Sequence, residues 1–533
     1  MNLKFWKRSD TVSEPFSDVD MRERIIAENI KTARTARSSM DAYWQRMRAY
    51  YDGTHDTARQ TDEFLSSLEL PWRPCTVPDG FLHVEGQIEA TPPDFEFSAR
   101  TGHESDMARQ REAIVRYVVQ NGDMTAKNAV NERRLNLYGS AVWKLAVTCD
   151  AQGEAQIAIE NPPIETVFPD PFGKTVDDCE YIACVYRMNT GKAVRIFTDD
   201  LQARGLTMEG IMAGKHRGKR DLLGLGDTVE ITEYWFRQAD SGEIALSILI
   251  EGNEVRYLPK FWSKTSYDSY PFVIYARIPT ENMIWGKSEL EPIIPLIDAA
   301  DRQLLFAQLN TAFFANDILV YEENAFAGDS YPENRPGAVW KLRPGMMDKV
   351  KRLGGLSSDN IAHYEIAEKY RFMMKETLGN YDFMQGDSST QVTTATGLAL
   401  LGDYASKRTK AKNICKKAGF ERLYRLIDAM VLEIFSAERL HAITDCEGAF
   451  CFEDYQKTFG FVPMVDVSIH VGEGFENSRS FTLSALSELC TMDMNEMNYP
   501  IVRAYISALG IPERTVLTEA LDKKFENGEM THE

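Results

Sequence analysis

The chain has 533 residues, of which 44% are hydrophobic, and a formal net charge of −20 at pH 7. This length exceeds what one hydrophobic core serves, so we expect about two to four domains. No apolar run reaches the roughly 18 residues that would span a bilayer, and such an acidic chain is a poor passive nucleic-acid binder because phosphate affinity comes from Lys and Arg.

The first residues, MNLKFWKRSD, are not followed by the apolar core of a secretory signal. The eight cysteines are therefore expected to be reduced thiols in a cytoplasmic compartment rather than a disulfide framework.

The first half of the chain predicts helices followed by antiparallel strands. Apolar residues recur at helical spacing from an N-cap at Ser17–Asp18 to Gly53, and TPPDFEF after them is extended. Two helices are expected at 105–120 and 124–138. Strands and one short helix then predict an antiparallel α/β module over residues 140–275. Its strands are SAVWKLAVTCD with the hairpin partner GEAQIAIENPP, then IETVFPDPF, CEYIACVYRM, VEITEYWFRQ and IALSILIEGNEVRYL, and its helix is GKAVRIFTDDLQARG.

The second half predicts long helices. One of about 27 residues should begin at Ser288, and a second should cover NIAHYEIAEKYRFMMKETLG. A small extended segment separates them, over 318–353. A helix of more than forty residues should follow from Thr396, bent or interrupted at Gly419. Residues 441–533 hold 16 Asp and Glu against 6 Lys and Arg, and predict one β segment and further helices.

No motif indicates catalysis or metal binding. Gly286-Lys287-Ser288 lacks the glycine five residues earlier that a phosphate-binding P-loop needs, because that position is Glu281, so a helix start is favoured. Cys179 and Cys184 form one C-x4-C pair and Cys446 and Cys451 another, but sulfurs five residues apart on a strand point to opposite faces. Buried reduced cysteine is the favoured interpretation, and no cofactor or metal is expected.

A basic run occurs in the predicted long helix, from Ser406 to Lys417. Lys407, Lys410 and Lys417 fall near one helical face, with Arg408, Lys412 and Lys416 nearby. Two interpretations stay open: this face contacts DNA, or it pairs with acidic neighbours in the same chain or an adjacent subunit.

Six segments follow one another in a recognisable order over roughly residues 20–440: YWQRMRAYYDG, ATPPDFEF, NLYGSAVWKLAV, NPPIETVFPDPFGKTVDDCEYIACVYRM, YPFVIYARIPTENMIWGKSELEPIIPLIDAADRQL and STQVTTATGLALL. This order resembles that of the portal proteins of tailed double-stranded DNA bacteriophages.

The resemblance implies an α+β, portal-like fold, rich in helices. The expected parts are an N-terminal arm (1–19), an α/β wing (20–287), stem helix 1 (288–316), a small β-containing clip (317–357), stem helix 2 (358–379), a tunnel loop (380–395), a long helix returning to the wing (396–475) and a helical crown (476–533).

The tunnel loop is expected to face the DNA in the channel. DNA carries about one negative charge per 1.7 Å of its axis, so a wall rich in cations would hold the duplex. Small hydroxyl and amide groups offer contacts that exchange readily with water, and carboxylates repel the duplex slightly. The expected DNA-facing residues are Gln385, Gly386, Asp387, Ser388, Ser389, Thr390, Gln391, Thr393 and Thr394.

The function that the resemblance implies is a ring of identical subunits, expected to be a dodecamer, at one capsid vertex. It would serve as the channel for DNA packaging and ejection. The implied partners are double-stranded DNA, the terminase large subunit, a head–tail adaptor, and the major capsid and scaffolding proteins, with no membrane. The location would be the virion, after assembly in the host cytoplasm. Two alternatives stay open: a head–tail connector without a gating role, and a metal-dependent nuclease, for which we find no convergent carboxylates.

Overall fold

A computed structural model describes two units of the chain. The units are residues 1–48, 84–289 and 382–533, and residues 49–83 and 290–381. We consider each unit by itself. The residues described are 16–55, 78–99, 105–149, 155–215, 228–265, 267–315, 318–327, 341–353, 359–378, 395–436, 439–440, 443, 465–470, 499, 502–503 and 521.

Two antiparallel sheets form the centre of the first unit. One has five strands in the order β4-β5-β6-β7-β8 and the other three in the order β3-β2-β9. The predicted antiparallel module is therefore confirmed, and the described chain is α+β. The strands are β2 (Ser140–Cys149), β3 (Ala155–Glu160), β4 (Val167–Pro169), β5 (Tyr181–Asn189), β6 (Thr228–Arg237), β7 (Ile244–Ile250), β8 (Asn253–Leu258) and β9 (Phe272–Ala276).

Helix α1 (Phe16–Asp52) covers one face of the five-stranded sheet. Its residues Ile26, Ile30 and Ala33 recur every three or four positions and so form one stripe. This stripe packs on alternate residues of β5, among them Tyr181 and Ala183. The apolar residues of α1 recur at helical spacing and those of β5 alternate, so each set lies on one face, and the two faces pack together to form this part of the core.

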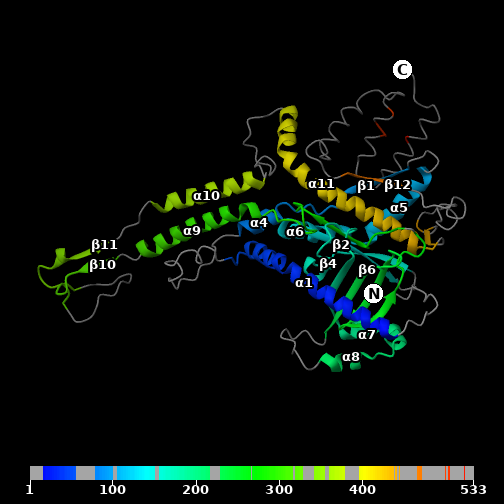
Figure 1. The fold of residues 1–533 in the computed structure, drawn as a ribbon. Coiled ribbons are helices and arrows are strands. Elements are labelled where there is room, and N and C mark those ends of the chain that lie inside the picture. The colour runs from blue at the N-terminus through cyan, green and yellow to red at the C-terminus, as the bar shows by residue number, and fades with distance from the viewer. Residues whose placement is uncertain are drawn as a thin grey trace, which may run out of the picture. The chain divides into compact units, whose positions relative to one another are not determined.

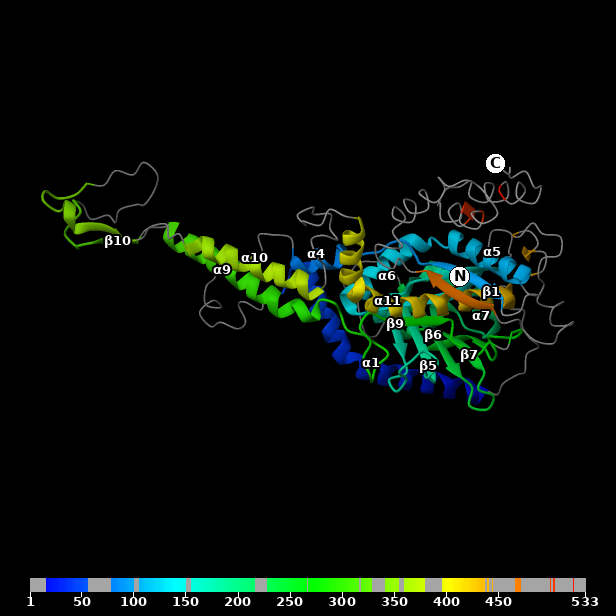
Figure 2. The ribbon, with the colours of Figure 1, turned by 90° about the horizontal axis from the view of Figure 1, so that it is seen from above.

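The other face of the five-stranded sheet meets the three-stranded sheet. Lys144 of β2 is buried and its Nζ lies 2.7 Å from Glu233 Oε2 of β6. The preceding residue, Trp143, points to the opposite side, where its ring contacts Phe420 of α11 (Ala395–Ile434). Helices α1 and α11 consequently lie on opposite sides of the strands (Figure 1 and Figure 2).

Further elements of the first unit pack beside these sheets. Helix α5 packs on α11 and on β1, and β1 pairs in antiparallel register with β12 from much later in the chain. The remaining elements are β1 (Asp94–Ala99), α5 (Ser105–Asn121), α6 (Met124–Tyr138), η2 (Ile164–Thr166), α7 (Thr190–Ala203), α8 (Met208–Lys215) and β12 (Val465–His470).

Two helices and a hairpin form most of the second unit. Helices α9 (Ile294–Ala315) and α10 (Asp359–Leu378) lie side by side (Figure 1 and Figure 2). Strands β10 (Ile318–Tyr321) and β11 (Val350–Leu353) pair in antiparallel register. The unit also includes the 3₁₀ turns η3 (Glu291–Ile293) and η4 (Met347–Lys349), and most of α4 (Asp79–Glu85).

Most predicted elements occur, but several boundaries were wrong. IALSILIEGNEVRYL is two strands, because Glu251 and Gly252 both take a positive φ and form a tight turn. In IETVFPDPF only Val167–Pro169 is strand, after a 3₁₀ turn. Helix α1 already begins at Phe16, before the expected cap.

Another difference concerns the segment WGKSEL, where the helix expected from Ser288 begins only at Ile294. The Ser288 amide donates to Tyr43 Oη, and the Ser288 hydroxyl donates to the Asn136 carbonyl oxygen. A Cβ on Gly286 would lie 2.6 Å from the Gly139 carbonyl oxygen. At this segment two backbone segments approach so closely that Gly286 has no room for a side chain. The segment is therefore neither a phosphate-binding loop nor the start of the helix.

Candidate functional site

The tunnel-loop residues expected to face DNA lie outside the described ranges. This holds for the whole set from Gln385 to Thr394. Lys407 and Lys410 lie within α11, but their side chains are not described. Lys417 is described and exposed.

Lys416, the neighbour of Lys417, has the opposite environment. Its side chain is 1% exposed, and its Nζ lies 2.8 Å from both Glu132 and Glu89. Burial raises the pKa of Glu132, and the positive charge of Lys416 opposes that effect. The ion-pair interpretation therefore holds for Lys416, and the DNA interpretation is untested for the three predicted lysines.

The two helices of the second unit pack through a narrow stripe. Ala367, Met374 and Leu378 are the buried apolar residues of α10. His363 of α10 bonds through Nδ1 to Gln303 Oε1 of α9 at 2.7 Å. Because these α10 positions share one helical face, the opposite face is directed away from α9.

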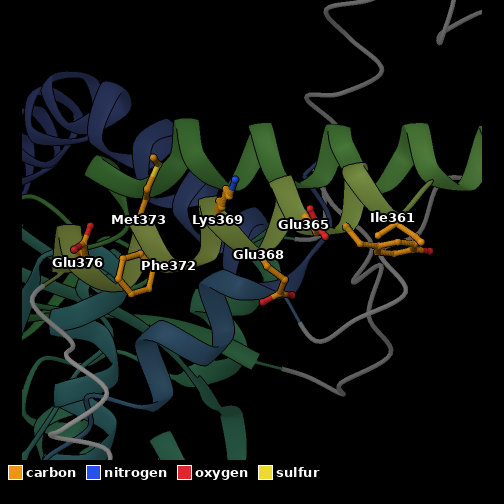
Figure 3. Close-up of a pocket in the computed structure, with 8 residues that line it drawn as sticks. Ile361, Glu365, Glu368, Lys369, Phe372, Met373 and Glu376 are labelled. Atoms are coloured by element: carbon orange, nitrogen blue, oxygen red, sulfur yellow. The ribbon is translucent and has the colours of Figure 1, made fainter. Parts of the chain in front are cut away.

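That opposite face of α10 carries an exposed apolar stripe. Ile361, Tyr364, Phe372 and Met373 are 63%, 52%, 54% and 47% exposed. They line a shallow groove with Glu365, Glu368, Lys369 and Glu376, and Figure 3 shows these side chains on successive turns of the helix. We call this surface the α10 stripe. Apolar side chains gathered in this way typically mark an interaction surface.

The base of the second unit is held by polar contacts. Tyr50 Oη donates to Asp298 at 2.9 Å, and His55 Nε2 lies 2.8 Å from Asp301 Oδ2. Burial lowers the pKa of His55, but its hydrogen bond to Asp301 and the charge there outweigh burial, so the pKa is raised above its ordinary value. Two aspartates in the first turns of α9 thus link that helix to the end of α1 and the residues just after it.

A third contact in the second unit joins α4 to α10. Arg371 Nε lies 3.2 Å from Asp79 Oδ1. Burial raises the pKa of Asp79, partly offset by the nearby Arg371. These contacts hold α9 and α10 in place within the second unit, and therefore also fix the position of the α10 stripe.

The prediction of buried, free thiols is confirmed for Cys179 and Cys184. Cys179 precedes β5, rather than lying on it, and both thiols are free and buried. Burial raises the pKa of each thiol to about 12, so neither is a thiolate at neutral pH. Within the described ranges, no His, Cys, Asp and Glu side chains gather in a group of three that could hold a metal ion. Cys446 and Cys451 lie outside those ranges.

Sequence reasoning missed the α10 stripe. The segment NIAHYEIAEKYRFMM contains apolar residues on more than one helical face, which is more than one partner helix needs. These additional apolar residues could have predicted a second contact surface on this helix. No helix among the described residues has the length and apolar character needed to cross a membrane.

Comparison with known proteins supports one family. Residues 29–260 match the family model "Phage P22-like portal protein". The resemblance stated from the sequence is therefore confirmed over this part of the chain. No curated protein sequence matches. The solved structure "Virion of native gene transfer agent (GTA) particle" aligns at a TM-score of 0.33 and 9% identity, over 76% of this chain and 99% of that chain, too weak a likeness to support an inference.

Proposed function

From the match of residues 29–260 to the phage P22-like portal family, we propose that this chain is a phage portal protein. That match is the observation that carries the proposal. The role is structural: a ring of identical subunits, a dodecamer, at one capsid vertex forms a channel for double-stranded DNA during packaging and ejection. The ring also serves as the docking platform for the terminase large subunit and a head–tail adaptor, within a virion built from major capsid and scaffolding proteins.

The described elements can be assigned to portal parts under this proposal. The two antiparallel sheets with α1 belong to the wing, α9 and α10 are the stem helices, and β10 with β11 belongs to the clip. The long helix α11 returns from the tunnel loop to the wing. The crown, over 476–533, falls almost wholly outside the described residues.

The α10 stripe supports self-association. Its four large apolar side chains extend over thirteen residues, or roughly 18 Å of helix. The facing helix α9 contacts the other side of α10, so a different surface has to cover the stripe. In a closed ring each subunit offers one surface to the next and a different surface to the previous one, which buries such a stripe between copies.

Electron microscopy of the purified full chain tests ring formation. We expect top views of a ring with a central hole. Phe372→Glu should weaken assembly, because it places a carboxylate in an apolar contact. Thr377→Glu, on an exposed position of the same helix, is the matched control and should assemble. A chain that stays monomeric under all conditions, or a Phe372→Glu variant that assembles normally, would contradict the proposal.

The tunnel loop, 380–395, remains a proposal of its own. We place its hydroxyl and amide side chains against the sliding duplex, where they contact DNA weakly. Shortening Ser388–Thr394 should leave rings intact but impair DNA packaging or retention. If rings with the shortened loop package and retain DNA normally, the protein acts as a connector without a gating role.

A further inference from the structure

The loop between β8 and β9 encloses a carboxylate from the far end of α11. Glu433 Oε1 accepts from the Ser263 amide at 2.7 Å and the Ser263 hydroxyl at 2.6 Å. Its Oε2 accepts from the Thr265 amide at 2.8 Å and the Thr265 hydroxyl at 3.0 Å. The Lys264 amide, between them, lies 2.9 Å and 3.0 Å from the two oxygens. Three successive backbone N–H groups and two hydroxyls thus converge on one anion.

This arrangement is held by buried anchors on both sides of the loop. The Trp262 indole N–H donates to the Ser269 carbonyl oxygen at 2.9 Å, and the Phe261 amide donates to the Ile244 carbonyl oxygen at 2.9 Å. Tyr270, fully buried, donates to the carbonyl oxygens of Cys179 and Glu180. The amides are therefore positioned by contacts that do not involve Glu433.

Consecutive backbone amides aimed at one point form an anion-binding concavity. We propose that residues 263–265 are an oxyanion-binding nest whose resident ligand is the Glu433 carboxylate. The ligand class is the small oxyanion, with carboxylates as the best fit, because the donors bind two oxygens of one planar group. When the Glu433 carboxylate is removed, the nest accepts a free carboxylate. The inference is independent of the portal role.

The competing explanation is that Glu433 simply packs at the end of α11. Glu433 is 3% exposed and its neighbours Leu432 and Ile434 are also buried. In that case truncation would cost stability, but no anion would restore it. The two explanations therefore differ in a chemical rescue experiment.

The experiment compares full-length wild type with Glu433→Ala in sodium acetate and in sodium chloride at equal ionic strength. Acetate reproduces the deleted carboxylate. We expect the melting temperature of Glu433→Ala to fall in chloride, and to rise with acetate until the nest saturates. At ten times the acetate dissociation constant, the rise above chloride should be about 1–2 °C for a cooperative unit of this size.

Glu421→Ala is the matched control on the same helix, because Glu421 pairs with Arg425 on the surface. It and wild type should show no difference between acetate and chloride. Should Glu433→Ala fail to fold, its soluble yield on refolding in acetate against chloride is measured instead. Equal melting temperatures or equal yields in the two salts would overturn the proposal.

Discussion

At the scale of single residues, the first unit buries several charges and pairs them across long sequence distances. Glu254, with a fully buried side chain, accepts from Arg22 at 3.0 Å and from Arg204 at 2.8 Å. Lys144 and Lys416 are buried beside carboxylates. Replacing one partner of such a pair leaves the other charge in a poorly solvated place, and that cost is large.

Lys416→Met should therefore lower the free energy of unfolding by about 3–5 kcal/mol, because Glu132 would keep a buried charge without its cation. The neighbouring exposed Lys417→Met should change it by less than about 0.5 kcal/mol. Chemical denaturation of the two variants checks this. The double variant Lys416→Met with Glu132→Gln should regain part of the loss; equal midpoints for the two single variants would contradict the buried pair.

His55 should make the second unit more stable at mildly acidic pH. Its pKa is raised in the folded chain, so its stabilising contribution is fully present below the unfolded value of about 6.5 and is lost as pH rises through the folded value. The melting temperature of His55→Gln is compared with wild type at pH 5.5 and 8.5. The variant's deficit should be larger at pH 5.5. An equal deficit at both values would show that the His55–Asp301 contact does not depend on the charge of His55.

At the scale of elements, α11 depends on close approach to β9. The helix is assigned without a break from Ala395 to Ile434, so the predicted interruption at Gly419 does not occur. A Cβ at Gly419 would lie 2.8 Å from Cγ of Tyr275, a residue only 5% exposed. The glycine is therefore explained by packing between helix and sheet, and the helix stays continuous despite a low helix propensity there.

Gly419→Ala tests this explanation by its sign. Alanine normally stabilises a helix interior by about 1 kcal/mol over glycine. Here the added methyl group overlaps the near end of a buried ring, so we expect a loss of about 1–3 kcal/mol. Gly210→Ala in α8, where the nearest atom is the Thr207 hydroxyl oxygen at 3.1 Å, is the control and should be neutral or stabilising. Urea denaturation measures both, and a stabilising Gly419→Ala would contradict the packing role.

At the scale of the whole molecule, an acidic chain is proposed to conduct a polyanion. The net charge of −20 disfavours tight DNA binding, while α11 carries a local basic run. Lys416 in that run pairs with Glu132 and Glu89, so a DNA contact would have to come from other lysines of the run, such as the exposed Lys417.

Neutralising Lys407, Lys410 and Lys417 together tests that contact. If these lysines touch phosphates in the assembled ring, the slope of log affinity against log salt should flatten, by roughly 0.9 for each phosphate that is no longer neutralised. Fluorescence anisotropy with short duplex DNA measures the slope. An unchanged slope would favour ion pairs within the assembly.

The sequence alone predicted the kinds of elements, because local periodicity and turn residues act over short distances. It predicted α6 at Met124–Tyr138 and the hairpin of β2 and β3. It also indicated the portal resemblance, which the family match confirms over residues 29–260.

Only the tertiary structure decided which residues meet. The pairing of β1 with β12, the burial of Lys416 but not Lys417, and the nest around Glu433 all join segments distant in sequence. The exposure of the α10 stripe likewise depended on which face α9 covers. The physical reason is that burial and pairing are properties of contacts between elements, and a single sequence records periodicity within an element but not its neighbours.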